Sequence, residues 1–523
     1  MVSVLADNYR RYSSPVSLAE KQEKHEATKP AAAPSNERWS NWSNNHAYSP
    51  SKTLRPDSLQ QVQELVREHH AKGENLRCVG SGLSPNGLGF GPDGSVALSL
   101  EKMNRTIYVD KERRIAKFEA GTTVGQVVEE LAAEGLMLEN LASINLQQLG
   151  GFYQVSAHGT GGGIPPVDEQ ILELTIVTPG MGTLVLSKEK DPDLFNMCKV
   201  GLGCLGVVTD FTVRCVPLHR LREETRVISR ADLAKQHREI VSENKHAKYM
   251  WVPYEDKVVV VTANETSDEI SLIEDAHDRL NALSDMHELF QKLIPHQEVP
   301  VKLNFADLRT VLLAPANLDA DHVKHVNKAE AKYHTKVSGS VVKRADQTMA
   351  FDCGGQQLVL EVAMKSGADK HSADGKDVAF VQRLLERIEK ERIPAPVPIE
   401  HRFTSGTSST MSPVHGDGLY GWVGVVLYMP SPVQEDRAKV IAEFERYSKV
   451  TMAVAKEMGV DARIHWAKLE IPHEETDLKE LRAMLAKQYP LDTFREVRRR
   501  LDPKGILLSP WAATILESKT PTN

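Results

Sequence analysis

The chain has few cysteines and no long apolar run. Its five cysteines are an odd number without C-x-x-C spacing, which argues against a disulfide framework and against a zinc site. No apolar run reaches the roughly 18 residues of a membrane-spanning helix. The net charge of −7 argues against general nucleic-acid binding and suits a basic protein partner. These absences predict a protein with no transmembrane segment, no metal site and no nucleic-acid partner.

A second absence is the dinucleotide-binding fingerprint of a Rossmann fold. That fingerprint needs G-x-G-x-x-G between a strand and a helix. Residues 80–82 lack the third glycine, and Pro85 and Asn86 follow where the helix would begin. Residues 201–206 have the spacing, but they precede a strand-like run instead of a helix. We therefore expect any phosphate-binding site to be built from loops.

The chain is long enough for two or three domains. Its 523 residues are too many for one hydrophobic core. The composition, 41% hydrophobic and 26% charged, is ordinary for a globular protein. We predict an α+β fold without internal repeats. The predicted parts are a disordered, Lys/Glu/Ala/Pro-rich extension at 1–38, a mixed domain at 39–217, a sheet flanked by helices at 218–480 and a C-terminal segment at 481–523 that returns to the first domain.

Hydrophobic spacing predicts the main helices and strands. Leu59, Val62 and Val66 share one face of a helix that Asp57 can cap and Gly73 can end. Further helices are predicted at 124–131, 267–293 and 377–391, the second of these long and charged. Strands are predicted at 76–79, 96–100, 106–109, 115–119, 171–178, 183–187, 207–213, 249–252 and 258–262.

Three glycine-rich loops lie in the predicted first domain, at 79–89, 150–163 and 201–206. Glycine has no Cβ and adopts positive φ, so such loops bring backbone N–H groups close to a phosphate. One loop of this kind could equally be an ordinary turn. Three of them in one domain favour a phosphate-containing ligand.

Six ordered motifs carry a family resemblance. They are the 79–89 loop, Asn-Leu-Ala-Ser-Ile at 140–144, Ala-His-Gly-Thr-Gly at 157–161, Phe-Asp-Cys-Gly-Gly-Gln-Gln at 351–357, Ile-Glu-His-Arg at 399–402 and His-Trp-Ala-Lys at 465–468. Together they resemble the aldonolactone oxidoreductases of the vanillyl-alcohol-oxidase flavoprotein superfamily. The resemblance implies a PCMH-type FAD-binding domain of two subdomains, followed by a cap domain that binds the substrate over the flavin.

The resemblance also implies which residues bind FAD. They are Val79, Gly80, Ser81, Gly82, Leu83, Ser84, Asn86, Gly87, Ala142, Ser143, Gly150, Gly151, His158, Gly159, Thr160, Val207 and Val208. His158 could instead be a structural histidine bonded to backbone. Leu83 stands where several oxidases of the superfamily carry a histidine that bonds covalently to the flavin. Because leucine has no nucleophile, the resemblance implies non-covalent FAD.

The implied reaction oxidises a secondary alcohol of a polyhydroxy lactone, with L-galactono-1,4-lactone giving L-ascorbate. A hydride goes to the flavin and the hydroxyl proton goes to a base. Glu400 and Arg402 alternate by two, so they share one face of an extended segment, and the resemblance implies that they bind the substrate together with Ser143. A surface ion pair is the alternative. Lys468 is the third implied catalytic residue, with a packing role as its alternative.

Ala142 bears on the electron acceptor. The resemblance places it beside the flavin edge that oxygen must reach, where oxidases of the family tend to have glycine. A methyl group can fill a narrow path, so we predict that Ala142 limits oxygen access, with a role as a small packing residue as its alternative. Cytochrome c is the predicted acceptor, in the mitochondrial intermembrane space or at the inner-membrane surface.

Three further hypotheses stay open at this level. The chain could be an aldonolactone or alditol oxidase that uses oxygen. It could also act as an assembly or interaction factor for respiratory complex I, as plant members of the family are associated with. The resemblance places Cys353 near the active site, where it is a candidate redox-sensitive thiol, with a buried inert thiol as the alternative.

Overall fold

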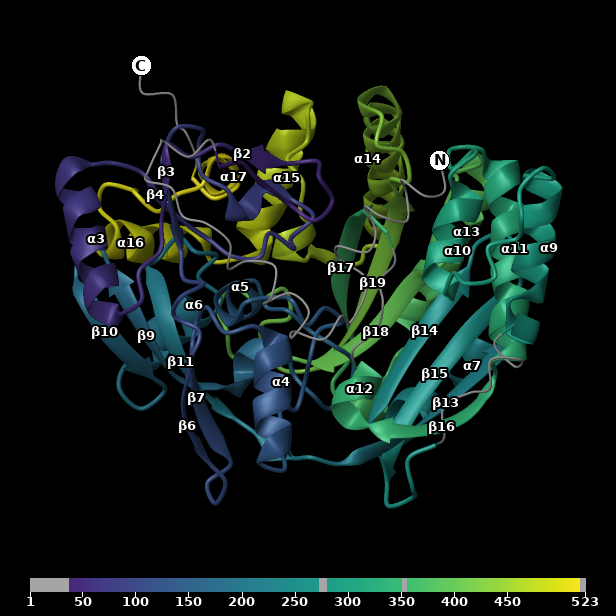
Figure 1. Ribbon diagram of the computed structural model, residues 1–523, viewed down its shortest axis with the longest axis horizontal. Coiled ribbons are helices and arrows are strands. Elements are labelled where there is room, and N and C mark those ends of the chain that lie inside the picture. The colour runs from purple at the N-terminus through teal and green to yellow at the C-terminus, as the bar shows by residue number, and fades with distance from the viewer. Residues whose placement is uncertain (1–36, 272–279, 350–354, 518–523) are drawn as a thin grey trace.

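The computed structural model describes residues 37–271, 280–349 and 355–517. Figure 1 shows two lobes side by side. The N-terminal segment, in purple and blue, shares one lobe with the yellow C-terminal helices, and the teal and green middle of the chain forms the other. The first and last described segments therefore share this lobe, and Leu507 bonds to Arg77 just before the first glycine-rich loop.

A small parallel sheet carries the first glycine-rich loop. Its order is β3(Lys52–Leu54), β5(Val96–Ser99) and β4(Leu76–Val79), and the helix α3(Leu59–Lys72) connects β3 to β4. Gly73 ends this helix with a φ of 69°, a left-handed conformation that glycine adopts without strain. The N-cap is Ser58 and not the predicted Asp57, so the helix begins one residue later than its sequence signal suggested.

A five-stranded antiparallel sheet completes the first lobe. The strand order is β10(Gly182–Ser187), β9(Ile171–Thr178), β11(Val207–Arg214), β7(Ile115–Glu119) and β6(Thr106–Asp110). The helix α4(Val124–Ala133) buries Val124, Val127 and Leu131, and Thr123 caps it with a reciprocal capping box. The predicted strands and the predicted helix at 124–131 are confirmed in this region.

The second lobe contains an eight-stranded antiparallel sheet. Its strand order is β16(Gly339–Arg344), β13(Arg220–Ile228), β15(Lys257–Thr266), β14(His246–Val252), β18(Ile399–Ser405), β19(Leu419–Tyr428), β17(Gln357–Gly367) and β20(Arg463–Ile464). The helices α7(Arg230–Glu243), α13(Lys376–Glu391) and α14(Gln434–Glu457) cover one face. The other face is turned toward the first lobe and forms one wall of the functional site.

Three helices cover the far end of that second face. They are α9(Ser284–Leu293), α10(Phe305–Leu313) and α11(Ala320–Lys336), which lie together at the edge of the second lobe in Figure 1. Their apolar side chains form a separate cluster that includes Tyr428 at the end of β19. This cluster extends the site wall beyond the sheet.

The predicted helix at 267–293 is wrong in its first part. The strand β15 continues to Thr266 because that residue pairs with Arg220 of β13. Asp268 then forms an ion pair with Arg222 of β13, which holds the chain against the sheet just beyond the end of β15. Of the remaining predicted range, 272–279 lie outside the described residues. The prediction is confirmed after them, where 280–282 are helical and α9 follows.

The C-terminal helices pack against the first lobe. They are α15(Glu475–Gln488), α16(Leu491–Leu501) and α17(Pro510–Ile515). The amide of Leu76, the first residue of β4, donates to the carbonyl of Ile506 at 2.8 Å. Of the helices among the described residues, none combines the length and the apolar character needed to span a membrane. The predicted domain boundaries at 38, 217 and 480 stay a prediction.

The remaining elements are short or lie between the sheets. They are β1(Trp39–Ser40), β2(Ala47–Tyr48), η1(Gly87–Gly89), β8(Leu136–Met137), α5(Leu149–Gln154), η2(Val167–Gln170), α6(Pro192–Lys199), β12(Val216–Pro217), α12(Ala345–Met349), η3(Lys370–Ser372) and η4(Trp466–Lys468). Three of these, η1, α5 and η4, adjoin the functional site.

Candidate functional site

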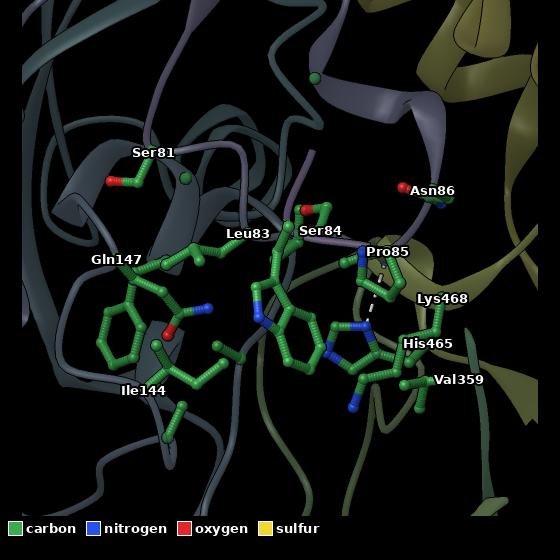
Figure 2. A pocket seen from close by; sticks show the side chains of 18 of the residues that line it. Ser81, Leu83, Ser84, Pro85, Asn86, Ile144, Gln147, Val359, His465 and Lys468 are labelled. Atoms are coloured by element: carbon green, nitrogen blue, oxygen red, sulfur yellow. Dashed lines mark hydrogen bonds between the residues drawn. The ribbon is translucent and has the colours of Figure 1, made fainter. Parts of the chain in front are cut away.

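A cavity of about 370 Å³ lies between the two lobes. Its size falls within the range of small-molecule and cofactor sites. One wall consists of the glycine-rich loops of the first lobe, and the opposite wall is the open face of the eight-stranded sheet. Figure 2 shows residues of both walls, with Ser81, Leu83, Ser84 and Pro85 from the first loop and Val359, His465 and Lys468 from the second lobe.

The first loop presents unused backbone donors to this cavity. It leaves β4 after Val79, and Gly82 turns it with a φ of 66°. The backbone N–H groups of residues 80–84 have no hydrogen-bond acceptor among the described residues, although these residues line the cavity. A row of unpaired N–H groups at a concave wall suits the phosphate oxygens of a dinucleotide cofactor.

Asn86 fixes the end of this loop to the second lobe. Its side-chain amide donates to the carbonyls of Trp466 and Leu469 at 2.8 and 2.9 Å, and its oxygen accepts from the amide of Leu88. Asn86 is 2% exposed. The Asn86 side chain, which was predicted to bind the cofactor, therefore makes its hydrogen bonds within the protein and connects the two walls of the cavity.

Arg77 plays a similar part behind the loop, and sequence reasoning missed it. The buried guanidinium donates to the carbonyls of Leu88, Gly203 and Leu507 at 2.8 Å each. These three carbonyls belong to the first glycine-rich loop, the third glycine-rich loop and the C-terminal segment. A charged residue inside the apolar strand at 76–79 was the available signal, because a buried arginine must find several acceptors.

The second and third glycine-rich regions complete the first wall. Ala142 and Ser143 line the cavity from the loop before α5, and Gly150 and Gly151 line it from α5 itself. The third loop leads into β11, and its last residue, Gly206, leaves no room for a side chain. A Cβ there would lie 2.5 Å from the Ile176 side chain.

Most of the predicted cofactor-binding residues line this one cavity. They are Val79, Gly80, Ser81, Gly82, Leu83, Ser84, Asn86, Ala142, Ser143, Gly150, Gly151, His158, Val207 and Val208. Gly87, Gly159 and Thr160 do not line it. Gly87 packs against His46, the Gly159 amide bonds to Asn140 Oδ1 at 3.0 Å, and the Thr160 hydroxyl donates to the Ala247 carbonyl. Their contacts hold the loops in place.

The second wall follows from strand register. Glu400 of β18 pairs with Gly424 of β19, and Gly424 pairs with Glu361 of β17. Residues that alternate by two stay on the same face, so Arg402, Val426 and Val359 also face the cavity, which they line. Gly424 has no side chain to fill the space between the two carboxylates. The wall therefore has an open position with a carboxylate on either side.

Glu361 is the centre of a buried charge network. Its carboxylate is 1% exposed, accepts from Arg402 Nη2 and Lys468 Nζ, and lies 3.2 Å from His158 Nε2. Arg402 also contacts Glu400, with Nε 3.2 Å from Oε2. The predicted pair of Glu400 and Arg402 on one strand face is confirmed as geometry, and it belongs to this larger network.

Sequence reasoning missed Glu361 as well. In β17 the buried residues Leu358, Leu360 and Val362 face away from the cavity. Glu361 lies between them on the cavity face, as a charged residue in an otherwise apolar part of the strand. A carboxylate inside a strand of apolar residues was the signal. Its partners could not be read from sequence, because they lie on β18, on η4 and in the loop that contains His158.

The network sets the protonation of its members. Burial by itself would raise the pKa of Glu361, but the charges of Arg402 and Lys468 and the contact with His158 hold it well below its usual range. Burial lowers the pKa of His158 against the attraction of Glu361. Burial, with the positive charge of Lys468, lowers the pKa of His465 well below its usual value. Near neutral pH, Glu361 is thus ionised and both histidines are neutral.

His158 has contacts that support both interpretations from the sequence. Its ring stacks on Trp422 with centroids 3.8 Å apart, and Nδ1 lies 3.0 Å from the Gly159 carbonyl. It also lines the cavity. His158, Glu361 and His465 bring possible metal ligands within 4.8 Å of one another. Both oxygens of Glu361 already bond to cationic side chains, which would repel a metal ion.

Cys353, the predicted redox-sensitive thiol, lies outside the described residues. Lys468, at the end of η4, faces the cavity, and its amino group bonds to Glu361. The three predicted catalytic residues Glu400, Arg402 and Lys468 therefore meet on one wall, opposite the unpaired amides of the first glycine-rich loop.

Comparison with known proteins agrees with this arrangement. Residues 50–187 match the family described as FAD binding domain, and residues 211–515 match the family described as D-arabinono-1,4-lactone oxidase. The chain is similar to L-galactono-1,4-lactone dehydrogenase 2, mitochondrial, of Oryza sativa subsp. japonica, with 40% identity covering 90% of this chain and 82% of that protein.

A second relative and a solved structure extend the comparison. L-galactono-1,4-lactone dehydrogenase, mitochondrial, of Arabidopsis thaliana is 39% identical, covering 90% of this chain and 79% of its own. The structure of a cholesterol oxidase from Brevibacterium sterolicum has a TM-score of 0.70 and 16% identity, covering 93% of this chain and all of that one; this likeness shows the fold. The chain belongs to the family of FAD-dependent aldonolactone oxidoreductases that includes the L-galactono-1,4-lactone dehydrogenases.

Proposed function

We propose that this chain oxidises L-galactono-1,4-lactone to L-ascorbate and passes the electrons to cytochrome c. The observation that carries the proposal is the position of Glu400 and Arg402, which face the unpaired loop amides across one cavity. The relatives bear the name of this reaction. The proposed cofactor cradle and the proposed polar substrate wall thus line the same cavity.

The first wall would bind FAD through backbone amides and not through charged side chains. The amides of residues 80–84 would bind its two phosphates, and Leu83 would pack against it without a covalent bond. FAD, once bound, supplies a two-electron acceptor for a hydride. FAD binding at this loop is then reversible, because the side chain of Leu83 has no nucleophile. A histidine at this position could form a covalent link to the flavin.

The second wall would bind the lactone over Gly424. Glu400 accepts the proton of the 2-hydroxyl group as the C2 hydrogen departs with its electron pair, which leaves a 2-keto lactone that tautomerises to L-ascorbate. Arg402 holds the hydroxyl oxygen, and its charge opposes the negative charge that develops as electrons leave the substrate. Glu361 keeps Arg402 and Lys468 oriented through direct hydrogen bonds.

The experiment for this proposal is anaerobic mixing of the purified protein with L-galactono-1,4-lactone. The protein should be yellow, release its flavin on denaturation, and lose its visible absorption on mixing. Oxidised cytochrome c added afterwards should become reduced. A protein that stays colourless with excess FAD, or a flavin spectrum that the lactone leaves unchanged, would overturn the proposal.

An oxygen-using oxidase is the second candidate function, because the family that matches residues 211–515 is described as an oxidase. Hydrogen peroxide in an amount equal to the lactone consumed would establish it. Little peroxide, with rapid cytochrome c reduction, would establish the dehydrogenase.

The proposed location is the mitochondrion, as the names of both plant relatives state, and within it the intermembrane space or the inner-membrane surface. The net charge of −7 suits a basic electron acceptor there.

We also propose respiratory complex I as a partner. Variants that lose FAD should keep that association if it is independent of catalysis, and pull-down with such a variant tests it.

A further inference from the structure

The cavity continues past the catalytic wall into a polar compartment between α10 and α11. Phe305 and Arg309 are four residues apart on α10, and Glu330 and His334 are four apart on α11, so each pair shares a helix face. All four line the same cavity as Glu400 and Arg402. None of the four belongs to a motif that the sequence linked to cofactor or substrate.

This compartment is buried and charged. Arg309 is 5% exposed, Glu330 1% and His334 8%. Arg309 Nη1 donates to Glu330 Oε1 at 3.1 Å, and the guanidinium lies over the ring of Tyr428 at 4.8 Å. Removing three such polar groups from water is costly unless they are bonded, so their placement at a cavity wall needs an explanation.

Two buried atoms in the compartment make no hydrogen bond within the described part of the chain. Glu330 Oε2 and His334 Nε2 have no hydrogen-bond partner among residues 37–271, 280–349 and 355–517, and the contact of His334 Nε2 with Glu330 Oε1 is 3.6 Å, too long for a hydrogen bond. Buried polar atoms of native proteins are nearly always bonded, to protein or to a ligand. An acceptor oxygen and an imidazole nitrogen side by side match a hydroxyl group, which both donates and accepts. An anion fits poorly, because the Glu330 carboxylate would repel it.

Strand register relates the compartment to the catalytic wall. Gly424, Val426 and Tyr428 alternate along β19 on the cavity face. Gly424 lies beside Glu400, and Tyr428 lies under Arg309. Val426 lies about 7 Å along the strand from Gly424, and Tyr428 about 14 Å. Val426 packs against the apolar cluster of α9, α10 and α11, so the compartment begins next to Val426. A lactone ring bound over Gly424 can therefore extend its exocyclic chain past Val426 toward Glu330 and His334.

We propose that Glu330 and His334 form a subsite for the exocyclic hydroxyl groups of the aldonolactone, with Arg309 holding Glu330 in place. This inference rests on the proposed function. A six-carbon 1,4-lactone carries two exocyclic hydroxyls and a five-carbon 1,4-lactone carries one. The subsite would favour the longer substrate, because its terminal hydroxyl reaches the buried pair.

The test compares flavin reduction by L-galactono-1,4-lactone with that by a five-carbon 1,4-lactone of the same ring configuration. His334→Phe keeps the ring packed against Phe305 and Tyr333 and removes Nε2. Glu330→Gln removes the charge. His325→Phe makes the same exchange on the exposed side of α11 and is the matched control. Flavin content of each variant checks folding.

Loss of one hydrogen bond to a charged or buried group corresponds to about tenfold in specificity. His334→Phe and Glu330→Gln should each lower kcat/KM for the six-carbon lactone about tenfold, and that for the five-carbon lactone by less than about twofold. His325→Phe should change neither. If Glu330→Gln does not fold, His334→Phe, which leaves the Arg309–Glu330 pair intact, decides the question.

Two results would overturn the subsite while leaving the proposed function intact. One is an equal loss with both lactones, and the other is no loss with either. A parent enzyme that reduces its flavin with neither lactone would overturn the proposed function itself, and the subsite with it.

Discussion

At the scale of single residues, Glu400 and Arg402 carry the proposed chemistry. Glu400→Gln removes the proton acceptor and Arg402→Ala removes the cation beside it, so each should slow flavin reduction by lactone at least about tenfold. Stopped-flow absorbance under anaerobic conditions measures this rate. Glu224→Gln, at an exposed position of β13, should not change it. Unchanged rates in both active-site variants would move the reaction elsewhere.

Ala142 is the residue that tests the electron acceptor. It lines the cavity from the loop of the first lobe, and we predict that its methyl group blocks oxygen. Ala142→Gly should reoxidise in air severalfold faster than the parent and release more peroxide. Ala157→Gly, which opens the same cavity at another point, is the control. Equal reoxidation rates in Ala142→Gly and the parent would show that this methyl group does not limit oxygen.

His465 gives the site a pH-dependent stability. Burial lowers its folded pKa well below the usual value, whereas the unfolded chain binds the proton near pH 6.5. The contribution of neutral His465 to the free energy of unfolding is therefore fully present above about pH 6.5. It is lost as the pH falls below that value, by about 1.4 kcal/mol per pH unit for one histidine.

His465→Asn removes this titration and keeps an acceptor for the Ala467 amide, which Nδ1 accepts at 3.1 Å in the parent. The free energy of unfolding, measured at equal FAD concentration between pH 7.5 and pH 5, should fall less steeply in the variant. Parallel curves for the two proteins would contradict the prediction.

At the scale of elements, Arg77 joins β4 to the first and third glycine-rich loops and to the C-terminal segment. Arg77→Met would keep much of the packing and leave three buried carbonyls unbonded. With about 1–3 kcal/mol for each orphaned group, we expect a lower melting temperature and weaker FAD binding, measured by calorimetry and by titration of the apoprotein. Arg67→Met, exposed on α3, should change neither. Unaltered FAD affinity would mean that the loops hold their shape without this arginine.

At the scale of the whole molecule, the C-terminal helices belong physically to the first lobe. Trp511 is 2% exposed and donates to the Leu469 carbonyl at 2.8 Å, and Ile506 bonds to the start of β4. A chain that ends at Tyr489 should expose these contacts and fail to bind FAD.

The matched control is a chain that ends at Glu517, which keeps α16 and α17 and should bind FAD as the full chain does. Size-exclusion chromatography with absorbance at flavin wavelengths measures both. A yellow, monodisperse protein that ends at Tyr489 would show that the first lobe folds without its C-terminal partner.

Local sequence signals predicted the parts of this protein that depend on near neighbours in the chain. Glycine spacing marked the three loops, hydrophobic alternation marked the strands of both lobes, and the i, i+2 spacing of Glu400 and Arg402 placed them on one face. Each of these follows from backbone geometry within a few residues. Where a longer-range contact competed, as when Asp268 paired with Arg222 of β13, the predicted helix did not form in its first residues, 267–271.

Only the tertiary structure decided which distant residues share the cavity. Glu361 meets Arg402 because β17 pairs with β19 and β19 with β18, a register that no local pattern specifies. Arg77 gathers carbonyls from three segments, and Glu330 and His334 reach the cavity because α11 packs over the end of the sheet. Burial makes these contacts strong, since charges removed from water must find partners across the fold. The amino-acid sequence therefore determined the cofactor loops and the family, whereas the packing of the two lobes determined the charge network and the polar compartment beside it.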